Sequence, residues 1–191
     1  GITVVDNPRS WVSHGLNRAI AATSAEFVVR VDGHCTLPPD YTSLAVEALD
    51  RIAWRAGELG ISLVLENMLP HLFAGHVRDL LWLLGALAST NVGLCLDTGH
   101  AFLSGDLHHV AHKLSGHLWM VHASDNRGER DDHLAPGEGR IAWPDLLQQL
   151  ATVHFTGTFI LELAAVEDPV ELLRRARSSA DYLRRLAGAP T

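Results

Sequence analysis

The chain has 191 residues, of which 47% are hydrophobic and 19% are charged, and 15 basic against 22 acidic residues give a formal charge of −7. This composition excludes a disordered, collagen-like or coiled-coil protein and indicates a globular protein with a full-sized core. The acidic balance disfavours a nucleic acid partner, because a net negative chain is repelled by a polyphosphate.

Cysteine content and the longest apolar stretch bear on the cellular compartment. Cys35 and Cys95 are the only cysteines and form no CxxC motif, so we expect a cytoplasmic protein without a disulfide framework. The longest uncharged run, Leu80 to Leu96, is interrupted by Ser-Thr-Asn at residues 89–91. It is shorter than the roughly 20 apolar residues that span a bilayer, so no membrane partner is expected.

The first 42 residues predict a short strand–helix–strand unit. The two strands, Ile2 to Val5 and Phe27 to Val31, are apolar runs followed directly by an aspartate, and the helix lies near Gly15 to Ala22. The segment closes with Leu-Pro-Pro-Asp at residues 37–40, where two adjacent prolines prevent a helix from continuing. We therefore place a boundary near residues 38–43.

From residue 43 onward, apolar runs of strand length alternate with longer segments of helical period. This alternation is typical of parallel βα units and predicts an α/β protein. The expected helices are Ser43–Leu59, His76–Ala88, Leu107–Leu114, Trp143–Val153 and Pro169–Leu186, and the expected strands are Ile61–Leu65, Val92–Leu96, His117–Val121 and Thr158–Leu161.

Each of these four strands ends in a side chain that can bind a metal ion. Glu66, Asp97 and Glu162 offer carboxylates and His122 offers an imidazole. Because the carboxyl ends of parallel strands converge, these four residues, called the quartet below, should face one cavity. They suit a divalent ion such as Mn²⁺, Mg²⁺ or Co²⁺. The alternative is that an acidic residue after a strand only caps the following helix.

Other residues near the strand ends have less specific patterns. His100, three residues beyond Asp97, is placed to bind a substrate oxygen or a second metal. The loop at residues 123–133 is rich in charge, and its alternative interpretation is a solvated face. Cys95, Met68 and Trp119 are expected in the core. Seven histidines lack a partner pattern and are expected at the surface: His71, His76, His108, His109, His112, His117 and His154.

Five segments together resemble a known superfamily. They are Leu65-Glu66-Asn67, the run CLDTGH at residues 95–100, VHASD at residues 121–125, residues 133–139 with Pro-Gly-Glu-Gly, and Leu161-Glu162. In order and spacing they are similar to the xylose isomerase-like TIM barrels, which include sugar phosphate isomerases, epimerases and type 2 apurinic endonucleases. The resemblance covers about residues 43–186 and corresponds to the last four of eight βα units. It implies an incomplete TIM barrel, the C-terminal half.

The resemblance also implies roles for individual residues. The quartet matches the metal ligands of ketose epimerases, in which the two glutamates, here Glu66 and Glu162, also act as the acid/base pair. His100 matches a substrate-binding position, and an arginine after the histidine strand, here Arg127 or Arg130, is expected to contact substrate. In the endonuclease branch, His100, Asp131 and His133 would be additional ligands, and the metal would be zinc.

Residues 1–42 resemble a different family, the inverting family 2 glycosyltransferases. Asp32-Gly33-His34 would correspond to that family's metal and sugar-nucleotide motif. The chain is therefore expected to join a glycosyltransferase-like βαβ fragment, residues 1–42, to a xylose isomerase-like half-barrel, residues 43–191.

The expected function is a metal-dependent isomerase or epimerase of a small sugar or related hydroxy-carbonyl compound, working by proton transfer through an enediolate. The alternatives are a non-catalytic half-barrel remnant or fusion fragment, a zinc-dependent endonuclease-like hydrolase, and a glycosyltransferase fragment. Four βα units cannot close an eight-stranded barrel, so we expect the N-terminal strands or a second copy of the chain to cover the open sheet edges.

Overall fold

The computed structural model describes residues 41–188. The predicted strands Ile2 to Val5 and Phe27 to Val31, the helix near residues 15–22 and the glycosyltransferase-like motif at residues 32–34 lie outside the described residues.

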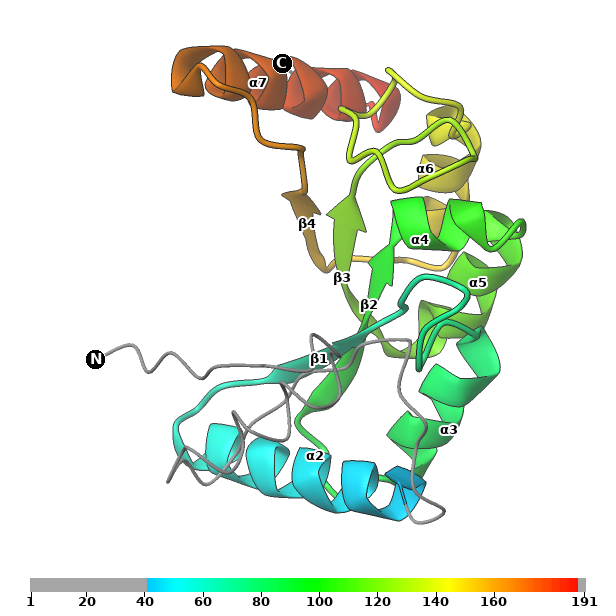
Figure 1. Ribbon diagram of the computed structural model, residues 1–191, viewed down its shortest axis with the longest axis vertical. Coiled ribbons are helices and arrows are strands. Elements are labelled where there is room, and N and C mark those ends of the chain that lie inside the picture. Colours follow the sequence, from blue (N-terminus) through cyan, green and yellow to red (C-terminus); the bar gives the residue numbers. More distant parts are fainter. Residues whose placement is uncertain (1–40, 189–191) are drawn as a thin grey trace, which may run out of the picture.

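Four parallel strands form one sheet, with the strands in chain order (Figure 1). They are β1 (Leu63–Glu66), β2 (Val92–Asp97), β3 (Leu118–Ala123) and β4 (Thr158–Leu161). The register pairs Glu66 with Cys95 and Asp97 with His122, so the carboxyl ends of neighbouring strands lie level. The sheet is not closed, and the predicted α/β fold of parallel βα units is confirmed.

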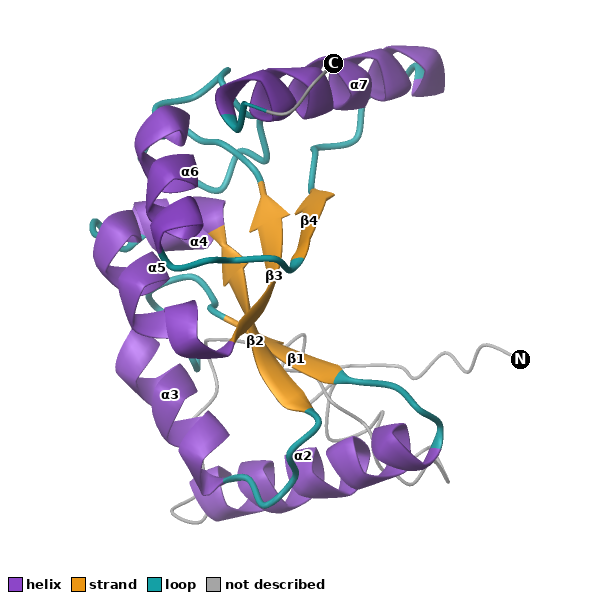
Figure 2. Cartoon of the chain, turned by 180° about the vertical axis from the view of Figure 1, so that it is seen from behind, coloured by secondary structure: helices purple, strands orange, loops and turns teal. Residues whose placement is uncertain are grey.

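Helices precede, connect and follow the strands. They are α2 (Tyr41–Glu58), α3 (Val77–Ala86), α4 (Thr98–Leu103), α5 (Leu107–Leu114), α6 (Trp143–Thr152) and α7 (Pro169–Leu186), with a short 3-10 turn at Ser115–His117. Helices α3, α5 and α6 run along one side of the sheet, while α2 and α7 lie at its two ends (Figure 2). Each predicted helix and strand between residues 41 and 188 is present, with ends that differ by no more than two residues.

Helix α4 is the one helix of the described segment that the sequence pattern does not predict. It is six residues long, which is too short to display a helical period, and it begins directly after β2. Its start is stabilised by Asp97, whose Oδ1 accepts a hydrogen bond of 2.7 Å from the backbone N–H of His100. The alternative role of a helix cap therefore applies to one oxygen of Asp97.

The core lies between the sheet and the helices on its side. All six residues of β2 are buried, and the helices contribute fully buried leucines such as Leu80, Leu114 and Leu146. Trp119 is 39% exposed, so the prediction that it belongs to the core is wrong. Its ring covers Gly93 from the neighbouring strand, where a Cβ would lie 2.1 Å from the ring. Met68 is only half-buried, in the loop after β1, whereas Cys95 is fully buried as predicted.

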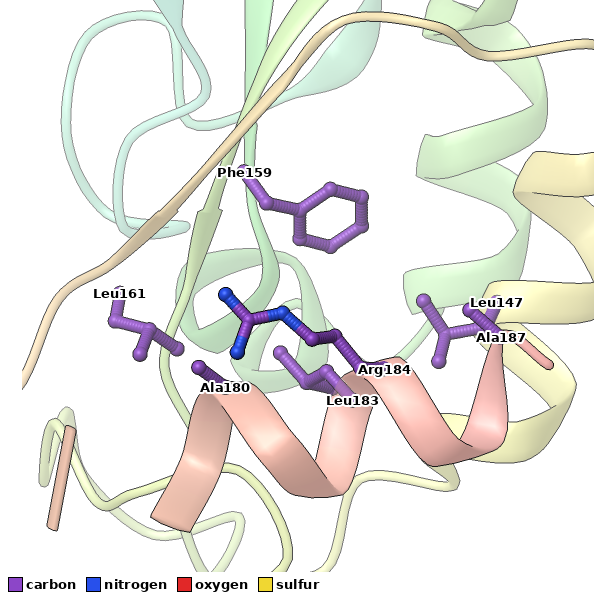
Figure 3. Close-up of a pocket in the computed structure, with 7 residues that line it drawn as sticks. All are labelled: Leu147, Phe159, Leu161, Ala180, Leu183, Arg184 and Ala187. Carbon is purple, nitrogen blue, oxygen red and sulfur yellow. The ribbon is translucent and has the colours of Figure 1, made fainter. Parts of the chain in front are cut away.

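Both edge strands of the sheet pair with only one described neighbour. Beside β4, an apolar groove of about 420 Å³ opens between that strand, α6 and α7 (Figure 3). Phe159 and Leu161 of β4 face Leu183 across it, and Arg184 extends over it (Figure 3). Within residues 41–188, no helix has the length and apolar character needed to cross a bilayer.

Candidate metal centre

The structure brings the quartet together at the carboxyl ends of the four strands. Glu66 is the last residue of β1, Asp97 the last of β2, His122 lies near the end of β3, and Glu162 directly follows β4. Each residue offers one ligand atom, and the four atoms all lie within 4.8 Å of one another. Because metal–ligand bonds are about 2 to 2.6 Å long, one ion at their centre can reach all four.

Three of the quartet's ligand atoms are buried and lack hydrogen-bond partners. Oδ2 of Asp97, Nδ1 of His122 and Oε2 of Glu162 are inaccessible to solvent and have no partner of suitable geometry. His122 Nδ1 lies 3.2 Å from an oxygen of Glu66 and 3.2 Å from one of Glu162, but neither contact has hydrogen-bond geometry. Buried polar atoms are normally paired, so three unpaired atoms directed at one point fit a shared cation.

Asn67 fixes the relative position of the first two ligands. Its side-chain N–H donates to the carbonyl of Asp97 at 3.0 Å, and its side-chain oxygen accepts the Asp97 N–H at 2.8 Å. This reciprocal pair connects the ends of β1 and β2 immediately beside Glu66. Asn67 has no predicted role, although its position next to Glu66 is a signal that a strand-end amide can bridge two strands.

Burial raises the pKa of two of the quartet's carboxyls. Burial raises the pKa of Glu66, against the attraction of His122 and His100. Burial likewise raises the pKa of Asp97 to about 6, opposed mainly by His100. Burial disfavours the charged form of His100 and so acts to lower its pKa. The attraction of Asp97 and of other neighbours outweighs burial, so the pKa of His100 is raised. Burial raises the pKa of the Cys95 thiol to about 12.

His100 lies beside the quartet and is held on both ring nitrogens. Its Nδ1 is 2.9 Å from the carbonyl oxygen of Asn67, and its Nε2 is 3.2 Å from Oδ2 of Asp131. The same Asp131 oxygen is 2.9 Å from Nε2 of His133, while the other, Oδ1, is buried without a partner. The structure therefore brings His100, Asp131 and His133 into one cluster adjoining the quartet.

The two arginine candidates lie on the exposed loop after β3. Arg127 is exposed, and Arg130 is paired with Asp132 at 2.6 Å, with most of its side chain in solvent. Arg130 and Asp131 border a hollow of about 540 Å³ whose other walls include Leu69 and Leu103. Neither arginine is placed among the quartet, and their substrate role stays a prediction.

Asp125 organises the loop that carries His133. Its Oδ1 accepts the N–H groups of Asn126 and Ile141 at 2.9 and 3.1 Å, and its Oδ2 accepts those of Gly137 and the Trp143 indole at 3.0 and 2.9 Å. The residue is fully buried. Asp125 stands in the VHASD motif but has no predicted role, because its partners are mostly backbone groups of a distant loop.

The seven histidines expected at the surface are all exposed, as predicted. Among the described residues, two groups place three or more ligand atoms close enough for one ion: the quartet, and a set formed by Glu66, Cys95 and His122.

Comparison with known proteins identifies the class of fold and then the family. Residues 16–186 match the family described as "xylose isomerase-like TIM barrel", and the chain belongs to that family. The match begins at residue 16 and so includes most of the segment that resembles a glycosyltransferase; that second resemblance has no support among the matches.

Individual relatives are similar over parts of their length. "Uncharacterized protein MJ1311" of Methanocaldococcus jannaschii is 33% identical over 130 residues, 64% of this chain and 44% of that protein. "Probable endonuclease 4" of Mycobacterium bovis is 32% identical over 125 residues, 60% of this chain and 46% of that protein. The chain thus spans about half the length of these curated relatives.

Solved structures agree with the fold. A D-tagatose 3-epimerase-like protein superimposes with a TM-score of 0.65 and 25% identity, covering 78% of this chain and 60% of that one. A xylose isomerase domain protein from Alicyclobacillus acidocaldarius gives a TM-score of 0.65 and 25% identity, covering 80% and 60%.

Proposed function

We propose that the protein contributes the metal centre of an isomerase or epimerase that acts on a small sugar or related hydroxy-carbonyl compound. The observation that carries the proposal is the quartet itself: three carboxylates and one imidazole from four strand ends, with buried, unpaired atoms directed at one point. The epimerase-like and xylose isomerase-like neighbours support the same class of substrate.

A divalent ion in the quartet would supply Lewis acidity, polarising a carbonyl and a hydroxyl oxygen of the substrate and acidifying the C–H between them. Glu66 ends β1 and Glu162 directly follows β4, the two outer strands, and each has an oxygen 3.2 Å from His122 Nδ1. One glutamate accepts the proton from the substrate carbon, and the other returns a proton to the opposite face. A raised pKa for Glu66 brings its proton affinity closer to that useful for such a transfer near neutral pH.

The hollow beside Asp131 gives the rest of the substrate a place to bind. Asp131 forms the link, because it contacts His100 next to the quartet and also borders the hollow. Leu69 and Leu103 form an apolar wall of this hollow. We expect substrates whose reacting carbonyl lies at the quartet and whose hydroxylated end extends toward Asp131.

The substitution Glu162→Gln tests the proposal. It keeps the size of the side chain but replaces an anionic ligand with a neutral amide, so Mn²⁺ affinity measured by calorimetry should fall about tenfold or more. Isomerase turnover should fall by about 10² or more, the usual size of a general-base contribution.

Glu167→Gln is the matched control, because Glu167 is exposed and lies five residues further along the chain. It should leave both quantities unchanged. Equal Mn²⁺ affinity in the wild-type and Glu162→Gln proteins, or no affinity in either, would contradict the proposal.

A second candidate function is hydrolysis of a phosphodiester at more than one zinc ion. It is favoured by the cluster of His100, Asp131 and His133 beside the quartet, and by the similarity to proteins called probable endonuclease 4. Binding of more than one Zn²⁺ per chain, with cleavage of an abasic DNA duplex that His133→Asn abolishes, would favour this function over the first.

A further inference from the structure

Cys95 lies immediately beneath the quartet. It precedes Asp97 by two residues in β2, so both side chains point to the same face of the strand. Its register partner is Glu66. The Cys95 side chain is fully buried, yet its sulfur, an oxygen of Glu66 and a nitrogen of His122 all lie within 4.8 Å of one another. The thiol is thus part of a three-residue ligand set.

Two features of this set fit a bound cation. His122 Nδ1 is buried without a hydrogen-bond partner, so the set contains an unsatisfied ligand nitrogen. Asp97, whose side chain is fully buried, directs an unpaired oxygen into the same space from the same face of β2. A cation that binds sulfur could use Cys95, which is not a ligand in the quartet.

The two ligand sets differ in the ion that they prefer. The quartet offers carboxylate oxygens and one nitrogen, which suit hard or borderline ions such as Mn²⁺ and Mg²⁺. The set with Cys95 replaces two carboxylates by one sulfur, which favours thiophilic ions such as Zn²⁺ and Cd²⁺. Because Glu66 and His122 belong to both sets, the two sets cannot be occupied by different ions at the same time.

We propose that the site has a second, overlapping binding mode, in which Cys95, His122 and Glu66 hold a thiophilic divalent cation that excludes the harder ion from the quartet. As the metal–sulfur bond forms, the thiol S–H bond breaks and its proton passes to solvent, with no change of oxidation state. The mode goes beyond the proposed function, since it requires no isomerase activity. It would make the protein sensitive to inhibition by soft metals.

A Cd²⁺ titration of the full chain, followed by the ultraviolet charge-transfer absorption of a cadmium–thiolate bond, tests the proposal. The wild-type protein and Cys35→Ser should develop the band at one Cd²⁺ per chain, and Cys95→Ser should not. Cadmium NMR of the Cys35→Ser protein should give a resonance in the range of thiolate ligation. A band that persists in Cys95→Ser, a band lost in Cys35→Ser, or a resonance typical of oxygen and nitrogen ligands alone would overturn the proposal. The NMR result does not depend on how well the Cys95 variant folds.

Glu162→Gln separates this proposal from the proposed function, because Glu162 belongs only to the quartet. It should weaken Mn²⁺ binding about tenfold while the cadmium–thiolate band remains. Added Cd²⁺ should displace Mn²⁺ from the wild-type protein one for one. Simultaneous binding of Mn²⁺ and the thiolate-bound Cd²⁺ would overturn the overlap, whereas an unchanged Mn²⁺ affinity in Glu162→Gln would contradict only the proposed function.

Discussion

At the scale of single residues, Asp97 illustrates how one side chain serves both fold and chemistry. Its Oδ1 caps α4 through the His100 N–H, while its Oδ2 is left buried and unpaired among the quartet. A carboxylate has two oxygens, so capping the helix does not prevent metal binding. The capping and metal-binding interpretations of a strand-end aspartate are therefore compatible at this position.

The raised pKa of Asp97 predicts how the stability of the metal-free protein depends on pH. Its pKa rises from 3.8 to about 6 on folding, so the folded state binds the proton more tightly than the unfolded state. The associated stability is complete below pH 3.8 and is lost as the pH rises through 6. The raised pKa of His100 acts in the same direction.

In EDTA, we expect the free energy of unfolding to fall by roughly 2 kcal/mol between pH 5 and pH 7.5. Urea titrations at the two pH values measure this change. Asp97→Asn should remove most of it, whereas Asp181→Asn, at an exposed position on α7, should retain it. Saturating Mn²⁺ should reverse the trend, since a cation stabilises the ionised carboxylates. A metal-free protein that becomes more stable as the pH rises through 6 would refute this account.

The sequence identified the quartet residues because each stands directly after an apolar run, and parallel strands bring such positions together. The same reasoning could not find the contribution of Asp125. Three of its four hydrogen-bond donors are backbone N–H groups, two of them in the loop at residues 137–141, and a backbone donor leaves no trace in the choice of side chain. The orientation of Arg127 and Arg130 was equally unpredictable, because exposed loop side chains are not fixed by packing.

At the scale of elements, the loop between β3 and α6 depends on one buried carboxylate. Asp125→Asn would replace one carboxylate oxygen by an NH₂ group. This group is itself a donor, so it cannot accept hydrogen bonds from the surrounding N–H groups. Leaving buried donors unpaired costs about 2 to 4 kcal/mol, so the urea midpoint should fall accordingly. Asp145→Asn, at an exposed position in α6, is the control and should change stability by only a few tenths of a kcal/mol.

The substitution Asp125→Asn should also loosen the position of His133, because Asp125 and Leu134 exchange two backbone hydrogen bonds of 2.8 Å. Binding of a second Zn²⁺ would weaken more than binding of the first. Wild-type stability in Asp125→Asn would show that the loop is held by other contacts.

Helices and strands were predicted to within two residues because their apolar periods are long enough to recognise. The exception, α4, depends on its tertiary setting: a Cβ on Gly99 would lie 2.6 Å from Ser124 Oγ, so the helix packs directly against the end of β3. That close approach requires glycine. It arises only when β2 and β3 are paired, so the sequence pattern alone does not reveal it.

At the scale of the whole molecule, the described chain is a four-stranded parallel sheet whose outer strands each have one free edge. Phe159 and Ile160 on β4 are 37% and 41% exposed, and Ile61 before β1 is 56% exposed. Exposed apolar strand edges promote association, so some polypeptide is expected to cover them. Which segment does so stays a prediction: residues 1–40, or a second copy of the chain.

Light scattering combined with limited proteolysis checks this prediction. Either the full chain is a dimer at micromolar concentration, or removal of the N-terminal segment by protease causes aggregation. Phe159→Asp should alter the association state or the rate of that proteolysis, and Val170→Asp, an exposed apolar position at the start of α7, should not. A monomer that stays soluble after losing the segment would contradict both alternatives.

The placement of one quartet residue at each strand end has a consequence for the stability of the open sheet. An ion held by all four would act as a reversible cross-link between β1 and β4, the outermost strands of the sheet and the most distant in sequence. Unlike a disulfide, it would dissociate when the chain unfolds, so it would stabilise the protein by binding the native state alone and not by restricting the unfolded chain. At a free ion concentration a hundred times the dissociation constant, the native state would gain about 2.7 kcal/mol. In an open sheet, that gain would replace part of the stabilisation that closing the ring of strands provides in a complete barrel.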